Sequence, residues 1–251
     1  MERRYIPESE SKLTILYALR RVGPATAMQL LHFLVDNDLM NYITMQLNLS
    51  DMQEQGQLLL QSHPIGDLLT LTQEGEFTLD AFAQRIPVSR RQLMDACAPA
   101  WRERFRLEQL TPADSFTLQD GSICLRLRLL EGSASLIDIL ITLPHQSSLT
   151  FLEQRWRTAA QAVYDTVTLT LSADFGAPDP DAVPGDTALI QHTGGSEWLL
   201  SLTDQPERPN LTILLPLADE NLARHCAARW PGCMDALRRH ILQALQDGLE
   251  T

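Results

Sequence analysis

The second half of the chain matches itself at an offset of 74 residues without gaps, which predicts that one folding unit occurs twice. The matched pairs are Arg155-Trp156 with Arg229-Trp230, Gly121-Ser122 with Gly195-Ser196, SLIDILITL (residues 135–143) with NLTILLPL (residues 210–217), and Val163, Val167 and Leu171 with Leu237, Ile241 and Leu245. Agreement across a turn, a strand and a helical stripe indicates a duplication. We place the repeats at residues 111–174 and 185–248, with an acidic, proline-rich linker at 175–184.

Each copy is expected to form three strands and then one helix. Alternating apolar residues predict strands at 115–118, 122–130 and 135–143 in the first copy, and at 187–191, 198–203 and 211–217 in the second. Apolar residues at helical spacing predict the helices at 149–171 and from Leu222 to Leu245. Pro231 is expected to kink or restart the second helix. The strand around Trp198 is out of phase by one residue, which indicates a bulge.

Two such copies side by side predict an antiparallel sheet of about six strands with both helices on one face. The opposite face is expected to carry Arg126, Arg128, Asp138 and Thr142. An open sheet face can hold a ligand or a partner. A solvated face with a cross-strand Arg/Asp pair is the favoured interpretation, because such pairs are common on half-exposed antiparallel sheets.

Residues 1–110 are predicted to form three helices, a hairpin and further helices. The first helix places Leu13, Leu16 and Tyr17 on one stripe and breaks at Gly23-Pro24. Thr26 and Gln29 have the spacing of a capping box, before a helix expected to bury Met28, Leu31 and Val35. Asn41 is expected to cap a third helix that buries Met45, Leu49 and Met52 and ends at Gly56.

The rest of this half continues with short elements. The runs QLLLQ and DLLTLT, joined by a turn with Pro64 and Gly66, predict a hairpin. Thr72 opens a helix. Ser89 and Gln92 form a second possible capping box, before a long helix with the stripe Leu93, Cys97, Trp101 and Phe105.

This order of elements is that of a winged helix-turn-helix. The segments LTILYAL (residues 13–19), NDLMNYITMQLNLSDMQEQGQL (37–58) and LTLTQEGEFTL (69–79) resemble an uncharacterised bacterial domain-of-unknown-function family with an N-terminal winged helix. They are distantly similar to PadR- and MarR-type regulators. The resemblance covers about the first 110 residues and extends into the next sixty. It implies an α+β protein in which a winged helix-turn-helix precedes the duplicated βββα domain, and it imports little about function.

The charge distribution is unusual for a DNA-binding winged helix. The formal net charge is −12, and residues 41–71, the expected recognition helix and wing, contain Asp51, Glu54 and Asp67 but no Lys or Arg. Phosphate contacts supply most of the affinity of such proteins for DNA and its salt dependence. The available cations lie elsewhere in the sequence: Arg3, Arg4, Lys12, Arg20 and Arg21, then Arg85, Arg90 and Arg91.

Two functions from different classes remain open. The first is a transcriptional regulator that binds double-stranded DNA as a homodimer, with the duplicated domain used for sensing or assembly. Its base contacts are expected from Asn41, Tyr42, Thr44, Gln46 and Gln53, and its phosphate contacts from Lys12, Arg20 and Arg21. The second is a non-enzymatic protein-interaction or dimerisation module in which Ile43 and Leu47 face a partner.

The sequence supplies no residues for an enzyme, a metal site or a cofactor. No zinc-protease, nucleophile-elbow, phosphate-loop, dinucleotide-binding or EF-hand pattern occurs. His225, Cys226 and Cys233 come nearest to a metal cluster, but Cys226 belongs to an apolar stripe, so the four cysteines are expected to be reduced packing residues. Without an apolar leader or membrane span, the protein is expected to be cytoplasmic, with no membrane partner.

Overall fold

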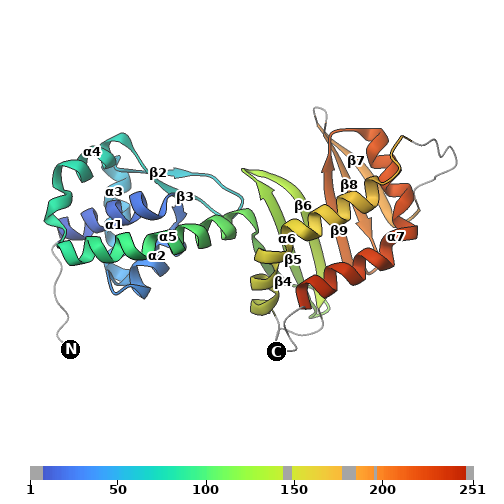
Figure 1. Ribbon diagram of the computed structural model, residues 1–251, viewed down its shortest axis with the longest axis horizontal. Coiled ribbons are helices and arrows are strands. Elements are labelled where there is room, and N and C mark those ends of the chain that lie inside the picture. The colour runs from blue at the N-terminus through green and yellow to red at the C-terminus, as the bar shows by residue number, and fades with distance from the viewer. Residues whose placement is uncertain (1–7, 144–148, 177–184, 195–196, 247–251) are drawn as a thin grey trace. The chain divides into compact units, whose positions relative to one another are not determined.

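A computed structural model describes residues 8–143, 149–176, 185–194 and 197–246. The chain divides into two compact units, residues 1–109 and 110–251, coloured blue to green and green to red in Figure 1. Both units combine helices with an antiparallel sheet, so the fold class is α+β. None of the described helices is long and apolar enough to cross a membrane.

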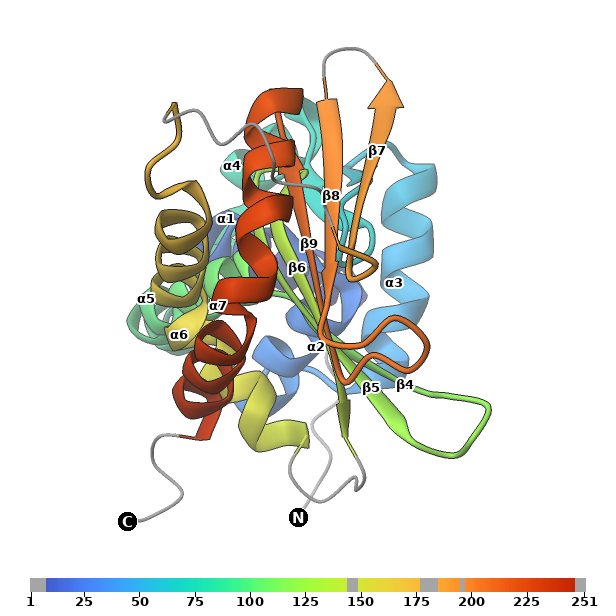
Figure 2. The ribbon, with the colours of Figure 1, turned by 90° about the vertical axis from the view of Figure 1, so that its right-hand side faces the viewer.

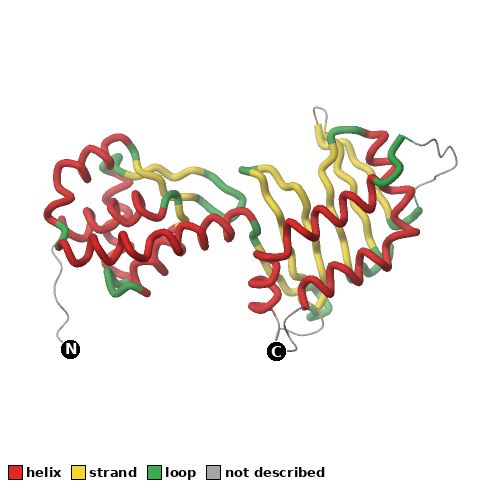
Figure 3. The backbone as a smooth tube through the Cα atoms, in the orientation of Figure 1, coloured by secondary structure: helices red, strands yellow, loops and turns green. Residues whose placement is uncertain are grey.

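The first unit consists of helices around a small sheet. Its elements are α1 (Glu8–Val22), β1 (Ala25–Thr26), α2 (Ala27–Asp36), α3 (Tyr42–Glu54), β2 (Leu58–Gln61), β3 (Leu68–Leu71), α4 (Gln73–Phe82), the 3₁₀ turn η1 (Ala83–Arg85) and α5 (Val88–Leu110). The strands pair antiparallel in the order β1-β3-β2. The tube in Figure 3 shows the two short strands β2 and β3 as a hairpin.

Side-chain caps fix where three of these helices begin. The Thr26 hydroxyl accepts the Gln29 N–H at 3.2 Å, while the Gln29 side chain accepts the Thr26 N–H at 3.0 Å, which completes the predicted capping box. Asn41 and Thr72 cap α3 and α4 as predicted. The capping box predicted at Ser89 is wrong, because α5 already begins at Val88. The Pro87 carbonyl starts that helix by accepting the N–H groups of Arg90 and Arg91.

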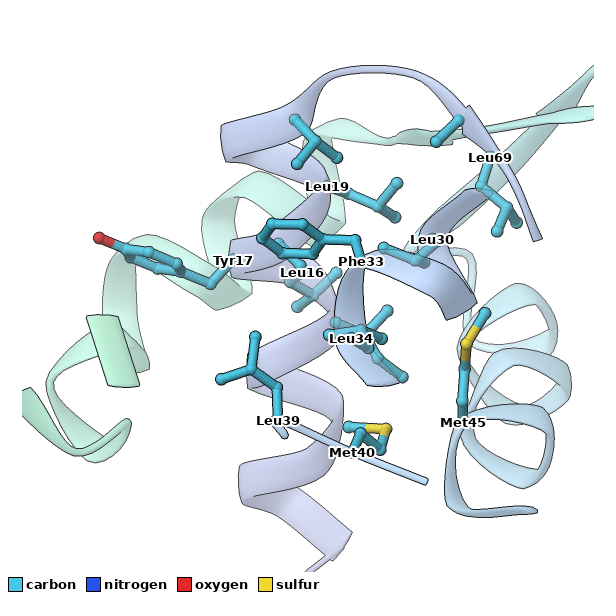
Figure 4. Packing of buried hydrophobic residues seen from close by; sticks show 14 of the residues in the cluster. Leu16, Tyr17, Leu19, Leu30, Phe33, Leu34, Leu39, Met40, Met45 and Leu69 are labelled. Carbon is cyan, nitrogen blue, oxygen red and sulfur yellow. The ribbon is translucent and has the colours of Figure 1, made fainter. Parts of the chain in front are cut away.

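The core of the first unit surrounds α1, which is buried on most sides (Figure 4). The face predicted for α2 is wrong: Met28 is 55% and Val35 42% exposed, while Leu30, Phe33 and Leu34 are fully buried. Both stripes of this helix are apolar, and packing of Leu30, Phe33 and Leu34 beside Leu16 and Leu19 decides between them (Figure 4).

The face of α5 also differs from the prediction. Phe105 is buried as expected, but Leu93 is 44% exposed, and its neighbour Met94 is fully buried instead. Cys97 and Trp101 pack against the core only partly. The buried side of this long helix therefore shifts by one residue near its N-terminal end.

The second unit is a six-stranded antiparallel sheet with two long helices on one face (Figures 1 and 3). Its elements are β4 (Ala113–Thr117), β5 (Ile123–Glu131), β6 (Ala134–Leu143), α6 (Leu149–Ser172), β7 (Ala188–Gly194), β8 (Glu197–Thr203), β9 (Leu211–Leu217) and α7 (Glu220–Gln246). The strand order is β4-β5-β6-β9-β8-β7. Pro231 lies inside α7, which does not restart there, although its ribbon changes direction part-way along (Figure 2).

A tryptophan anchors each long helix to the sheet. Trp156 and Trp230 are both fully buried. The Trp156 Nε1–H donates to the Arg128 carbonyl and the Trp230 Nε1–H to the Thr203 carbonyl, both at 2.8 Å. Each indole therefore fills the space between helix and sheet and satisfies its polar atom on a strand.

The two βββα halves correspond position by position. Ala113 pairs with Leu127 and Ala188 with Leu202, so the β4–β5 register recurs in β7–β8 at an offset of 75 residues. The buried strand residues Ile137, Ile139 and Ile141 recur as Leu211, Ile213 and Leu215 at an offset of 74, as do the tryptophans.

The predicted gap-free offset of 74 is thus wrong for the first two strands of each half. The bulges lie between Leu129 and Leu130 in the first half and between His192 and Gly194 in the second. A bulge adds one residue to one strand of a pair, so the halves shift by one residue relative to each other. Gly195-Ser196 lies outside the described residues.

Candidate functional site

The candidate binding element of the first unit is α3. The Asn41 Oδ1 accepts the Thr44 N–H at 2.9 Å at the start of this helix. Met45, Leu49 and Met52 are buried, as their spacing predicts. They fix which side of α3 meets the core and therefore which side meets solvent.

The solvent side of α3 is apolar at its centre. Ile43 is 69% and Leu47 68% exposed, and Tyr42 is 55% exposed. Residues four apart are neighbours on a helix, so Ile43 and Leu47 form one apolar strip. Exposed polar neighbours complete the surface: Gln46, Ser50, Asp51, Gln53 and Glu54. We call Tyr42, Ile43, Gln46, Leu47 and Ser50 the α3 surface.

The residues predicted to contact bases do not behave alike. Asn41, Tyr42, Gln46 and Gln53 are exposed, whereas Thr44 is half-buried. The Asn41 side chain is engaged in capping the helix, and the Thr44 carbonyl accepts a hydrogen bond from Asn48 at 2.6 Å. Four of the five predicted positions thus face solvent.

Lys12 is the predicted phosphate contact that lies beside α3. Its Nζ is 2.9 Å from Glu8 Oε1 and 3.3 Å from Asp51 Oδ2, and its side chain is 16% exposed. The hydrogen bond to Glu8, and then that to Asp51, raises the pKa of Lys12 above its usual value. The charge of Lys12 is therefore already compensated by two carboxylates, one of them on α3 itself.

The other two predicted phosphate contacts face different helices. Arg20 forms ion pairs with Glu76 at 3.6 Å and with Asp80, both on α4. The Arg21 Nε lies 2.7 Å from Asp95 on α5. The structure therefore does not gather Lys12, Arg20 and Arg21 into one patch. Arg3 and Arg4 lie outside the described residues.

A pocket of about 280 Å³ lies between the end of α1 and strand β3. It is lined by Leu19, Arg20, Gly23, Pro24, Leu69, Thr70, Leu71 and Glu76. The sequence did not reveal this pocket, because three separated segments supply its walls and no local motif marks them. Its two charged lining residues, Arg20 and Glu76, pair with each other.

The open sheet face of the second unit carries the predicted Arg and Asp residues in satisfied pairs. The Arg126 Nε lies 2.8 Å and 3.1 Å from the two carboxylate oxygens of Asp138, and the Arg128 Nη2 lies 2.7 Å from Asp114. Asp138 is only 5% exposed. The Thr142 hydroxyl donates to the Pro209 carbonyl at 3.1 Å. This face matches the favoured interpretation of a structural Arg/Asp pair.

The four cysteines are free thiols in apolar surroundings. Cys124 and Cys226 are buried, and Cys97 and Cys233 are half-buried. Burial raises the pKa of Cys226 to about 11, so its thiolate is disfavoured. Among the residues that the structure describes, no group of three or more His, Cys, Asp or Glu side chains could hold a metal ion.

Comparison with known proteins identifies a family. No curated protein matches the chain. The sequence profile of a family described as a domain of unknown function, DUF4364, matches residues 11–171. The match begins in α1, crosses the boundary between the units and stops one residue before the end of α6, so β7 to α7 lie beyond it. Because it covers more than half of the sequence, the chain belongs to the DUF4364 family.

Proposed function

We propose that this protein is a non-enzymatic binding protein whose first unit is a winged helix-turn-helix that recognises another protein through the α3 surface. The order α1-β1-α2-α3-β2-β3, with the sheet order β1-β3-β2, supports the winged-helix assignment. In that arrangement α3 is the recognition helix and β2–β3 the wing. The same assignment leaves the ligand open, because fold does not fix function.

The exposed strip of Ile43 and Leu47 on α3 carries the proposal. Covering one large aliphatic side chain stabilises a complex by about 1.5–3 kcal/mol, so the pair can contribute on the order of 3–6 kcal/mol. Tyr42 adds an aromatic side chain, a type enriched in protein interfaces. A phosphate backbone offers no apolar surface to cover this strip.

Electrostatics argue in the same direction. The expected recognition helix and wing contain Asp51, Glu54 and Asp67 and no Lys or Arg, and Lys12 is held between Glu8 and Asp51. Each phosphate contact contributes about −0.9 to the slope of log affinity against log salt. DNA binding through α3 would require Lys12 to leave both of its carboxylates.

We also propose that the second unit arose by duplication of a βββα module. The recurring strand register, the matched buried positions and the paired tryptophan hydrogen bonds support this. The family match ends close to the end of the first module, which supports treating β7–α7 as an added copy.

A transcriptional regulator that binds DNA as a homodimer is the second candidate function. One observation favours it: Asn41, Tyr42, Gln46 and Gln53 all face solvent on α3. Asn and Gln side chains can read the adenine edge in the major groove. The missing phosphate contacts would then have to come from elsewhere in the dimer.

Site-specific photo-crosslinking tests the proposed function. A photoreactive residue at Leu47 is expected to give one discrete protein adduct in host cells, and Ile43→Glu in the same chain should abolish it. The matched control carries the photoreactive residue at Asp36, an exposed position at the end of α2. Similar adducts from both positions would contradict a specific α3 contact.

Fluorescence anisotropy separates the two candidates. With a pool of genomic fragments at low salt, we expect no change in anisotropy at micromolar protein. Tight binding with a steep salt dependence that Arg20→Ala or Arg21→Ala reduces would instead establish the regulator.

A further inference from the structure

The six-stranded sheet of the second unit reads the same from both edges. Under the correspondence of the two halves, β4, β5 and β6 are equivalent to β7, β8 and β9, and the order β4-β5-β6-β9-β8-β7 is palindromic. The two halves meet only where β6 pairs with β9 in this sheet. Figure 2 shows these strands in the middle of the sheet.

The register of that central pair is two-fold symmetric. Ile139 pairs with Ile213, its own equivalent at the offset of 74 residues. One step away on either side, Asp138 pairs with Leu214 and Leu140 with Thr212. Leu214 is equivalent to Leu140, and Thr212 to Asp138, so the pairs exchange under the symmetry. This is the geometry of an isologous interface, in which each residue meets its counterpart from the other copy.

The side chains at this junction are self-complementary. Ile137, Ile139 and Ile141 of β6 and Leu211, Ile213 and Leu215 of β9 are all buried beneath the helices. The helices α6 and α7 also pack against each other above the junction. A β6 edge without β9 would present unpaired backbone groups and an apolar face, which is a template for another strand of the same kind.

We propose that the second unit is a covalent dimer, in which β7–α7 occupies the position that a second copy of β4–α6 would take. The inference rests on the duplication proposed above. The outer edge of β6 is thus a dimerisation edge that its own chain has filled. Each complete sheet carries one winged-helix unit, whereas two separate chains joined through β6 would carry two. A homodimer of this protein must therefore use a different surface.

The register offers a test that needs only one introduced thiol. The Thr142 N–H donates to the Asn210 carbonyl, so pairs 142/210, 140/212 and 138/214 are hydrogen-bonded and Ile139/Ile213 is a non-hydrogen-bonded pair. Cα atoms in such pairs lie about 4.5 Å apart, within the range for a disulfide. If β6 pairs with β6 of a second copy in the same register, position 139 faces position 139.

The experiment starts from the folded full-length chain. A protease site replaces residues 177–184, and Ile139→Cys is introduced. After cleavage, the halves can exchange partners in mild urea with a copper–phenanthroline oxidant. We expect a disulfide between two position-139 thiols, identified by mass spectrometry of the non-reduced digest, and only after cleavage.

Ile137→Cys is the matched control, because Ile137 is equally buried on the same face of β6. In the two-fold register position 137 faces position 141, and two position-137 thiols are four residues out of register, roughly 13 Å apart at about 3.3 Å per residue. The 139 link should exceed the 137 link at least tenfold. Equal links from both variants, or no 139 link after exchange, would overturn the covalent-dimer proposal. Neither result bears on recognition by α3, which the photo-crosslinking experiment tests separately.

Discussion

Gly75 in α4 is the position where we expect the smallest substitution to have the largest structural effect. A Cβ at this residue would lie 2.3 Å from the Gln57 carbonyl oxygen, and that oxygen also accepts the Thr72 N–H at 3.2 Å. The obstacle is backbone rather than a flexible side chain. Gly75→Ala must therefore push the start of the β2–β3 hairpin away from α4.

The magnitude follows from three opposing contributions. Alanine raises helix propensity by at most about 1 kcal/mol over glycine. Overpacking costs about 1–3 kcal/mol, and loss of the Thr72–Gln57 hydrogen bond about 1 kcal/mol. Gly75→Ala should thus lower the free energy of unfolding by about 1–3 kcal/mol. For a unit of this size each kcal/mol lowers the midpoint by roughly 4–8 °C.

Gly232→Ala is the matched control. Gly232 also lies in a helix, and a Cβ there meets nothing within 4 Å. This variant should gain stability by up to about 1 kcal/mol from propensity alone. Differential scanning calorimetry of both variants measures the difference. If Gly75→Ala is as stable as Gly232→Ala, the close approach of α4 to the hairpin is not a constraint and the reasoning fails.

Three further outcomes are expected. Trp156→Phe and Trp230→Phe each leave a strand carbonyl without its indole partner, so urea denaturation should show losses of about 1–3 kcal/mol that agree between the two variants; a large inequality would weaken the equivalence of the halves. The Cys226 thiol, with its pKa of about 11, should be alkylated by iodoacetamide at pH 8 about a hundredfold more slowly in the folded protein than in urea, as followed by mass spectrometry; rapid labelling would show that it is not buried. Asn41→Ala removes the α3 cap and should cost about 1 kcal/mol in thermal unfolding, whereas Asn41→Asp should be close to neutral.

The strands and the long helices of the second unit could be predicted because their residues repeat at the period of the element. Ile137, Ile139 and Ile141 alternate along β6 and all face the helices. The helix stripe through Trp156, Val163 and Val167 is buried as its spacing predicts. Period alone failed in α2, where two apolar stripes compete and packing with other elements decides.

The charge environment of α3 could not be predicted from the sequence. Lys12 meets Asp51 across 39 residues, and Arg21 meets Asp95 on α5. No spacing rule connects such distant residues, because the contacts exist only once the helices have packed. The cations counted as available for phosphate are therefore engaged within the unit. The exposure of Ile43 and Leu47, by contrast, follows from the same helical period that buries Met45, Leu49 and Met52.

The Arg126–Asp138 pair on the open sheet face has a consequence for how the two halves diverged. Under their correspondence, Arg126 is equivalent to Ser201 and Asp138 to Thr212, so a charged pair in one half stands where the other has two hydroxyls. A buried carboxylate that loses its guanidinium costs about 3–5 kcal/mol. Replacing either residue alone passes through that deficit, whereas replacing both avoids it. The two positions therefore behave as one inherited character, and a chain descended from the duplication carries both members or neither.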